Sequence, residues 1–159
     1  MRSIDKIKTR RQLLAIVDKY KKQGKKIAFT NGCFDILHSG HIKYLEAAKN
    51  KADILLVAVN TDSSVKKIKG LKRPINKQSD RIKVLSAISC IDYLTFFGEE
   101  TPLNLIKLLK PDVLIKGGDW DIKKIVGSAV VRSYGGKVIT IPYIKGYSTT
   151  NLIKKINAL

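Results

Sequence analysis

Apolar and polar positions along the chain follow two alternating patterns, which together predict an α/β fold. Five short apolar runs, at residues 27–30, 54–59, 93–97, 113–116 and 138–141, are typical of buried strands. The stretches between them repeat their apolar residues at helical spacing. Because strands that alternate with helices pair in parallel, we expect a Rossmann-like three-layer sandwich with a five-stranded, mostly parallel sheet and an extra N-terminal helix.

Helix-start signals agree with this pattern. Thr9 and Gln12 have capping-box spacing, which predicts a helix over residues 9–23. Thr101 followed by Pro102 is typical of an N-cap and a first helical position. Further helices are predicted after the first strand, with Ile42, Leu45 and Ala48 on one face, over residues 79–87, and from Ser148 onward.

Polar residues gather where the predicted strands end. They occupy residues 30–41, 60–73 and 117–120, and residues 148–151 follow the fifth strand at some distance. In parallel sheets, ligands bind beyond the carboxyl ends of the strands, so we expect a site there. Residues 60–78 are polar and basic, and we expect them to form a mobile loop over that site.

Length and composition suit a single folded unit. The chain has 159 residues, 44% of them hydrophobic. We divide it into an N-terminal helical extension, residues 1–24, and a main domain, residues 25–159. No run approaches the ~20 apolar residues of a membrane span, the polar N-terminus lacks a secretory signal, and Cys33 and Cys90 have no partner motif. We therefore expect a cytoplasmic protein with reduced thiols and no membrane partner.

The formal net charge of +18 indicates an anionic partner. A nucleic acid is one such partner, and a small anionic substrate is another. Lysines far outnumber arginines and are spread along the whole chain, whereas surfaces that read bases and clamp phosphates rely more on arginine. Because the chain also lacks a helix-turn-helix pattern and an aromatic-rich segment, we expect no nucleic-acid partner.

The sharpest local feature is a pair of histidines, His38 and His41, at a predicted helix start. Helical spacing places both imidazoles on one face, and Gly40 between them lets a phosphate approach the backbone. The helix N-terminus adds free N–H groups and the positive end of a dipole. Two alternatives stay open: histidines that only cap or pack locally, and a metal pair, for which no third ligand is evident. We favour an anion site without a protein-bound metal.

The segment around these histidines resembles the signature of the HxGH nucleotidyltransferase (cytidylyltransferase-like) superfamily, with Thr-Asn-Gly-Cys-Phe-Asp-Ile-Leu-His-Ser-Gly-His at residues 30–41. The likeness extends over nearly the whole chain to one branch, the D-glycero-β-D-manno-heptose 1-phosphate adenylyltransferases. The segments that carry it are residues 29–45, 58–62, 68–70 with 73–74, 116–120 and 146–151. The ordered set is much more specific than the first segment alone.

The resemblance implies that residues 25–159 form a nucleotidyltransferase domain, which converts ATP and heptose 1-phosphate to ADP-heptose, a lipopolysaccharide core precursor, and pyrophosphate. The attacking sugar phosphate oxygen is already anionic at neutral pH, so the lack of an obvious general base agrees with this reaction. By analogy with the superfamily, His38 and His41 are the catalytic residues that stabilise the α- and β-phosphates in the transition state. Mg²⁺ would arrive with the nucleotide and bridge its triphosphate.

The resemblance also implies a nucleotide site. Its residues are Asn31, Gly32, Cys33, Phe34, Gly40, Lys116, Gly117, Gly118, Asp119, Ser148, Thr149 and Thr150. Residues 148–150 offer hydroxyls and N–H groups to phosphates, and the glycines let a base or ribose approach the backbone. Trp120 either walls this site or simply packs.

Other polar residues are candidates for contacts with the acceptor or with phosphates. They are Asn60, Asp62, Lys69, Arg73 and Arg81. For any one of the cations, a solvated surface charge is a competing interpretation. We interpret Asp35 as ordering the histidine loop rather than as a catalytic acid.

Two rival functions stay open. Glycerol-3-phosphate cytidylyltransferase shares the HxGH motif, but that family carries Arg-Thr-x-Gly before its Ser-Thr-Thr, and residues 143–146 here contain no arginine. A non-catalytic module that binds nucleotide or nucleic acid is the other rival. In many organisms the heptose branch is fused to a sugar kinase domain, for which this chain has no room, so we expect a separate heptose 7-phosphate kinase. Relatives are often dimers, and the N-terminal helix could form part of a homodimer interface.

Overall fold

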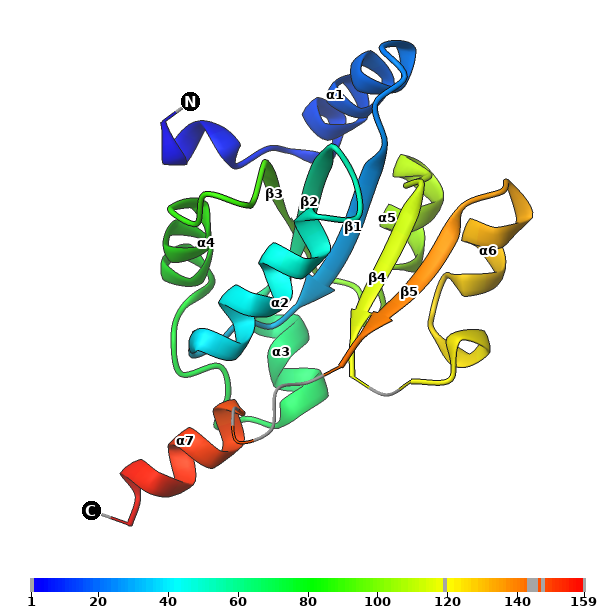
Figure 1. Ribbon diagram of the computed structural model, residues 1–159. Coiled ribbons are helices and arrows are strands. Elements are labelled where there is room, and N and C mark those ends of the chain that lie inside the picture. The colour runs from blue at the N-terminus through cyan, green and yellow to red at the C-terminus, as the bar shows by residue number, and fades with distance from the viewer. Residues whose placement is uncertain (1, 119, 143–145, 147, 159) are drawn as a thin grey trace.

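A sheet of five parallel strands forms the centre of the protein, as described by a computed structural model for residues 2–118, 120–142, 146 and 148–158 (Figure 1). The strand order is β3-β2-β1-β4-β5, and every neighbouring pair is parallel. The strands are β1 (Ile27–Gly32), β2 (Ile54–Asn60), β3 (Tyr93–Phe97), β4 (Val113–Gly117) and β5 (Lys137–Ile141). The predicted five-stranded α/β fold is confirmed, and the sheet is parallel throughout.

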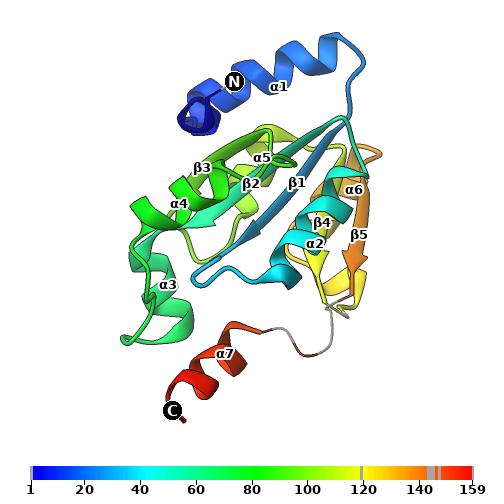
Figure 2. The ribbon, with the colours of Figure 1, turned by 60° about the vertical axis from the view of Figure 1, so that its left-hand side comes forward.

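Helices cover both faces of this sheet (Figure 1 and Figure 2). One face packs against α1 (Arg10–Lys22), α5 (Leu103–Leu109) and α6 (Ser128–Ser133), and the other against α2 (Ser39–Lys49) and α4 (Gln78–Ser86). Strand side chains alternate between the two cores, as for Phe29 on the α1 side and Ala28 on the α2 side. The remaining elements are α3 (Asp62–Lys69), α7 (Thr149–Ile156) and two short 3₁₀ helices, η1 (Ser3–Lys6) and η2 (Ile122–Lys124).

The N-terminal helix is an integral part of one core. Its capping box forms as predicted, because the Gln12 N–H donates to Thr9 Oγ1 at 3.3 Å and the Thr9 N–H donates to Gln12 Oε1 at 2.9 Å. Leu13 and Val17 of α1 are each 1% exposed and pack in the core on that face. The helix therefore buries apolar surface together with the strands.

The prediction of a loop over residues 60–78 is wrong for residues 62–69, which form α3, whereas residues 70–77 connect α3 to α4. Thr61 caps α3 by accepting a hydrogen bond from the Ser64 N–H at 3.3 Å, and Val65 is fully buried. The predicted cap at Thr101 is also wrong, because α5 begins one residue later with Pro102 in the N-cap position and no side-chain cap. Helix α6 has only six residues, too few for a helical period to stand out in the sequence.

Aspartates hold buried N–H groups where strands begin. Asp92 Oδ2 accepts from the Leu55 N–H at 2.7 Å and from Lys49 Nζ at 2.6 Å. Asp112 Oδ2 accepts from the Ile27 N–H at 2.9 Å. Because these bonds fix where neighbouring strands start relative to each other, they also align the opposite, carboxyl edge of the sheet.

Replacing Asp92 with alanine should lower the free energy of unfolding by about 1–3 kcal/mol, because the Leu55 N–H is buried and would lose its partner. Chemical denaturation followed by circular dichroism measures the loss. Asp53→Ala is the matched control, since Asp53 accepts from the exposed Lys26 N–H and water can take its place. Equal losses from the two substitutions would contradict the role given to burial.

Candidate active site

The candidate site lies at the carboxyl edge of the sheet, where β1 and β4 are neighbours. Since β1 leads to α2 on one face and β4 leads to α6 on the other, this is the topological switch point at which α/β sheets bind ligands. Lys116 Nζ donates to Asn31 Oδ1 at 3.5 Å and joins the two strand ends. Thr149 Oγ1 donates to the Ile36 carbonyl oxygen at 3.3 Å. Three segments that are far apart in the sequence therefore meet here.

His38 and His41 stack on each other at the N-terminus of α2. Their ring centroids are 3.9 Å apart and their planes are inclined by 28°. The His38 N–H donates to His41 Nδ1 at 3.4 Å, and the His41 N–H donates to the His38 carbonyl oxygen at 2.9 Å. In a neutral ring whose Nδ1 accepts, the proton sits on Nε2, so His41 can present a donor to a ligand.

Burial lowers the pKa of both imidazoles. For His41, burial together with the neighbouring His38 lowers the pKa to about 4. Burial also lowers the pKa of His38 below its usual value. Both rings are therefore neutral at pH 7 in the unliganded protein, and a bound anion would favour their protonated forms.

Asp35 fastens the histidine loop to residues 73–76. The residue is 3% exposed, and its carboxylate accepts from Arg73 Nε at 2.6 Å and from the N–H groups of Ile75 and Asn76, both at 2.9 Å. Burial alone would raise the pKa of Asp35, but the hydrogen bonds from Asn76, Ile75 and Arg73 outweigh it and hold the pKa below its usual value. Asp35 is thus an anion that orders this loop.

Arg81 lies beneath the site with a fully buried side chain. Nη2 donates to the Asn60 carbonyl oxygen at 2.7 Å and to Asp62 Oδ1 at 2.9 Å, and Nε donates to the Asn76 carbonyl oxygen at 3.1 Å. Nη1 donates to the carbonyl oxygen of Cys33. All three guanidinium nitrogens are used within the protein, so Arg81 joins strand ends instead of facing a phosphate.

Positive charge surrounds Cys33, in the loop that follows β1. Burial, and to a smaller extent repulsion from Lys69, lowers the pKa of the Lys116 ammonium. Burial raises the pKa of the Cys33 thiol, while the charges of Lys69, Arg81 and Arg73 oppose this rise. Lys69 itself is exposed at the end of α3, and Arg73 is partly exposed beside Asp35. Such an arrangement suits an anionic ligand.

The glycines after β4 form a constrained turn. Gly118 has a φ of +105° and donates its N–H to the Ile141 carbonyl oxygen at 2.8 Å, which a residue with a side chain would do only with strain. Gly117 accepts from Trp120 Nε1 at 3.1 Å, and Trp120 is 52% exposed. Asp119, between them, lies outside the described residues.

The remaining predicted residues lie at the starts of α2 and α7 and at the end of β1. Ser148 caps α7 by accepting from the Asn151 N–H at 3.0 Å, and Thr150 is exposed in its first turn. Gly40 is partly exposed in the first turn of α2. A Cβ on Gly32 would lie 3.0 Å from the Phe34 ring, so this position requires a close approach of ring and backbone.

Some contacts of the site were not predicted from the sequence. The backbone N–H groups that bind Asp35 left no signal, because any residue carries an N–H. A second case is Thr30 Oγ1, which lies 2.6 Å from the Tyr44 hydroxyl, and that hydroxyl donates to the Ile115 carbonyl oxygen at 3.4 Å. A hydroxyl within an apolar strand, and a tyrosine three residues after His41, could have indicated this contact.

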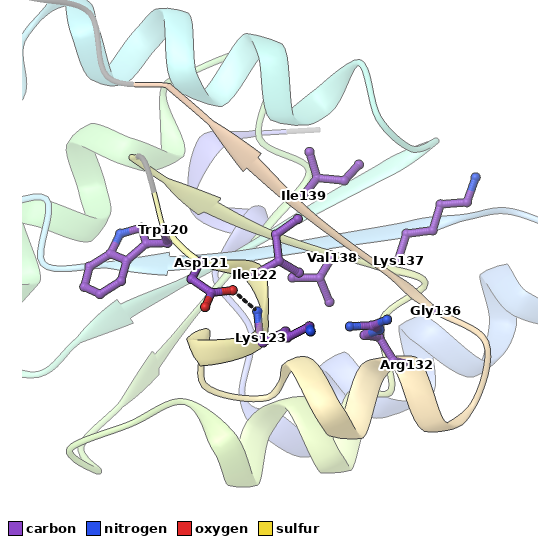
Figure 3. A pocket seen from close by; sticks show the side chains of 9 residues that line it. All are labelled: Trp120, Asp121, Ile122, Lys123, Arg132, Gly136, Lys137, Val138 and Ile139. Atoms are coloured by element: carbon purple, nitrogen blue, oxygen red, sulfur yellow. Dashed lines mark hydrogen bonds between the residues drawn. The ribbon is translucent and has the colours of Figure 1, made fainter.

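A separate cavity of about 700 Å³ lies along β5, between η2 and α6 (Figure 3). Its lining includes Trp120, Lys123, Arg132 and Lys137, and neither histidine contributes to it. The candidate site is therefore marked by its chemistry and not by this cavity. Across the described ranges, no group of three or more His, Cys, Asp or Glu side chains could hold a metal ion, and no helix is long and apolar enough to cross a membrane.

Comparisons with known proteins agree with the sequence resemblance. The chain is 51% identical to the bifunctional protein HldE of Geobacter metallireducens and 49% identical to that of Geobacter sulfurreducens. Each match covers 95% of this chain but 31% of the relative, so the chain spans less than a third of these curated relatives.

Solved structures share the fold. The lipopolysaccharide core biosynthesis protein from Thermoplasma volcanium is 27% identical with a TM-score of 0.64, over 79% of this chain and 100% of that chain. Pantothenate synthetase from Thermus thermophilus is 16% identical with a TM-score of 0.64, over 92% of this chain and 67% of that chain. The cytidylyltransferase-like family matches residues 29–155, which include both histidines and the start of α7. The chain therefore belongs to the cytidylyltransferase-like family, and its sequence-based assignment to the HxGH nucleotidyltransferases is confirmed.

Proposed function

We propose that the chain transfers AMP from ATP to D-glycero-β-D-manno-heptose 1-phosphate and releases pyrophosphate, which gives ADP-heptose for lipopolysaccharide core synthesis in the cytoplasm. The main observation in support of nucleotidyl transfer is the stacked pair of His38 and His41 at the N-terminus of α2, next to the topological switch point of the sheet. The choice of ATP and heptose is supported by the resemblance in residues 116–120 and 146–151. The HldE relatives and the lipopolysaccharide core protein of similar fold support it further.

The reaction needs positioned charge more than proton transfer. An oxygen of the sugar 1-phosphate attacks the α-phosphorus, and the bond from that phosphorus to the oxygen bridging to the β-phosphate breaks. The nucleophile is already anionic, so no side chain has to remove a proton from it. His38 and His41 donate hydrogen bonds to the phosphate oxygens as negative charge shifts toward pyrophosphate, and Lys116 adds positive charge at the end of β4.

Mg²⁺ would accompany the triphosphate, with nucleotide oxygens and water as most of its ligands. Asp62 fits as a contributor, because its carboxylate is 32% exposed and only one of its oxygens accepts from Arg81. When bound, the ion would neutralise part of the triphosphate charge. The acceptor must come from an enzyme that phosphorylates the sugar, carried on a separate chain or on the remainder of a longer one.

Pyrophosphate release from a panel of nucleotides and acceptors tests this function. ATP and CTP are each paired with heptose 1-phosphate and with glycerol 3-phosphate. We expect turnover with ATP and heptose 1-phosphate. Turnover with CTP and glycerol 3-phosphate, while ATP and heptose 1-phosphate stay inert, would overturn the assignment of both substrates.

His38→Ala and His41→Ala should each lower kcat by about 10²-fold or more, because a preorganised donor to the transition state is lost. Steady-state kinetics measures the loss, and circular dichroism confirms that each variant is folded. Lys123→Ala, in the cavity along β5, is the control and should keep the wild-type rate. Wild-type turnover in both histidine variants would mean that the two imidazoles do not stabilise the transition state.

ATP binding near pH 5.5 should take up more protons in the wild-type protein than in His41→Asn. The pKa of His41 is about 4 without ligand, and a bound triphosphate raises it toward or above the usual value of about 6.5. Protonation on binding therefore occurs between these two values. Calorimetry in two buffers of different ionisation enthalpy measures the protons taken up. Equal uptake by both proteins would mean that His41 does not face the phosphates.

A further inference from the structure

We propose that Arg81 is a positioning residue for nucleotidyl transfer, which acts through the carbonyl oxygen of Cys33 to aim the N–H of Phe34 at the nucleotide phosphates. This inference rests on the proposed function. It gives Arg81 an indirect role, because its guanidinium nitrogens already donate to the protein's own carbonyl oxygens and to Asp62.

The orientation follows from the planarity of the peptide unit. The carbonyl of Cys33 and the N–H of Phe34 belong to the same unit, and in a trans peptide they point in opposite directions. Since Arg81 Nη1 donates to this carbonyl oxygen, the N–H of Phe34 points away from Arg81. Within the residues described, no acceptor is found for this N–H, although Phe34 is only 6% exposed. This N–H is thus a donor that the protein itself does not use, and a phosphate oxygen at the carboxyl edge of the sheet would accept from it.

The same peptide is held in a strained conformation. Phe34 has a φ of +48°, in the left-handed region that bulky residues rarely adopt, at a cost of about 1–3 kcal/mol. Contacts on both sides maintain it: Arg81 binds the preceding carbonyl, and the following residue, Asp35, is fixed by Ile75 and Asn76. The Phe34 ring also lies 5.5 Å from the His41 ring, so the strained peptide and the histidine pair are parts of one packed unit.

A lysine at position 81 could not reproduce these contacts. The planar guanidinium reaches carbonyl oxygens on three segments, at Cys33, Asn60 and Asn76, from three differently placed nitrogens. A lysine ammonium is a single point of charge on a flexible stem, so Arg81→Lys keeps the charge but loses the geometry. The substitution therefore separates positioning from electrostatics.

Arg81→Lys should lower kcat/KM for ATP by about 10²-fold in protein that is folded by circular dichroism. Asp92→Ala is the matched control: it destabilises the fold from the opposite edge of the sheet, and its kcat/KM should stay at the wild-type value. If Arg81→Lys loses stability as Asp92→Ala does but keeps the wild-type kcat/KM, the residue is merely structural and the proposal is overturned.

A second measurement uses the wild-type protein, so it tests the proposal even if the Arg81 variant fails to fold. In the wild-type protein, ATP should shift the Phe34 amide proton downfield in a ¹H–¹⁵N spectrum, as expected for a new hydrogen bond to phosphate. Lys123→Ala, in the cavity along β5, leaves the bond from Arg81 to Cys33 in place and should preserve that shift. If ATP moves the amides of residues 38–40 but not that of Phe34, the role of Arg81 is wrong while the proposed function stands. If ATP causes no shift anywhere, both are overturned.

Discussion

The N–H groups of a buried guanidinium need hydrogen-bond acceptors within the protein. The acceptors of Arg81 lie on separate segments, and these bonds fix the positions of those segments in the candidate site. They are the ends of β1 and β2 and the segment before α4, which no other single side chain here connects within the described residues. An uncompensated charge in this place would cost several kcal/mol, so the strand ends cannot move apart cheaply. The histidine loop, residues 33–38 between β1 and α2, is held in place by the same bonds, because Arg81 donates to its Cys33 carbonyl oxygen.

Asp35 also holds this loop, through hydrogen bonds to the segment before α4. Its carboxylate is as buried as the Arg81 guanidinium, and the backbone of residues 75–76 binds it while the Asn76 carbonyl oxygen accepts from Arg81. The two charged groups are thus linked through one short segment without touching each other. This link ties residues 73–76, within the connection between α3 and α4, to the site.

The sequence was sufficient for the strands, the capping box at Thr9 and the histidine pair, because each leaves a local signal in apolar spacing or residue type. It was insufficient where a contact depends on the third dimension. Arg81 has the same charge as a surface arginine, and only its burial at the junction of three segments shows that its donors are used. Helix α3 was not predicted for a related reason. It is short and mostly polar, so its apolar residues show no clear helical spacing, and its cap, Thr61, is a residue type that is also common in loops.

Because the two histidines are neutral, the positive charge that attracts anionic substrates comes from other residues. Burial lowers the pKa of both rings, and for His41 repulsion from His38, whose ring centroid lies 3.9 Å away, adds to this effect, so both rings are uncharged at pH 7. The net charge of +18 is carried mostly by exposed lysines, and its effect on anionic substrates is long-ranged and screened by salt. Attraction and catalysis are therefore separable, because the surface charge concentrates substrate, whereas hydrogen-bond donors held by a buried frame act only on the bound phosphates. Raising the salt concentration weakens the first effect much more than the second, since buried contacts such as those of Arg81 and Asp35 are screened far less than exposed charges.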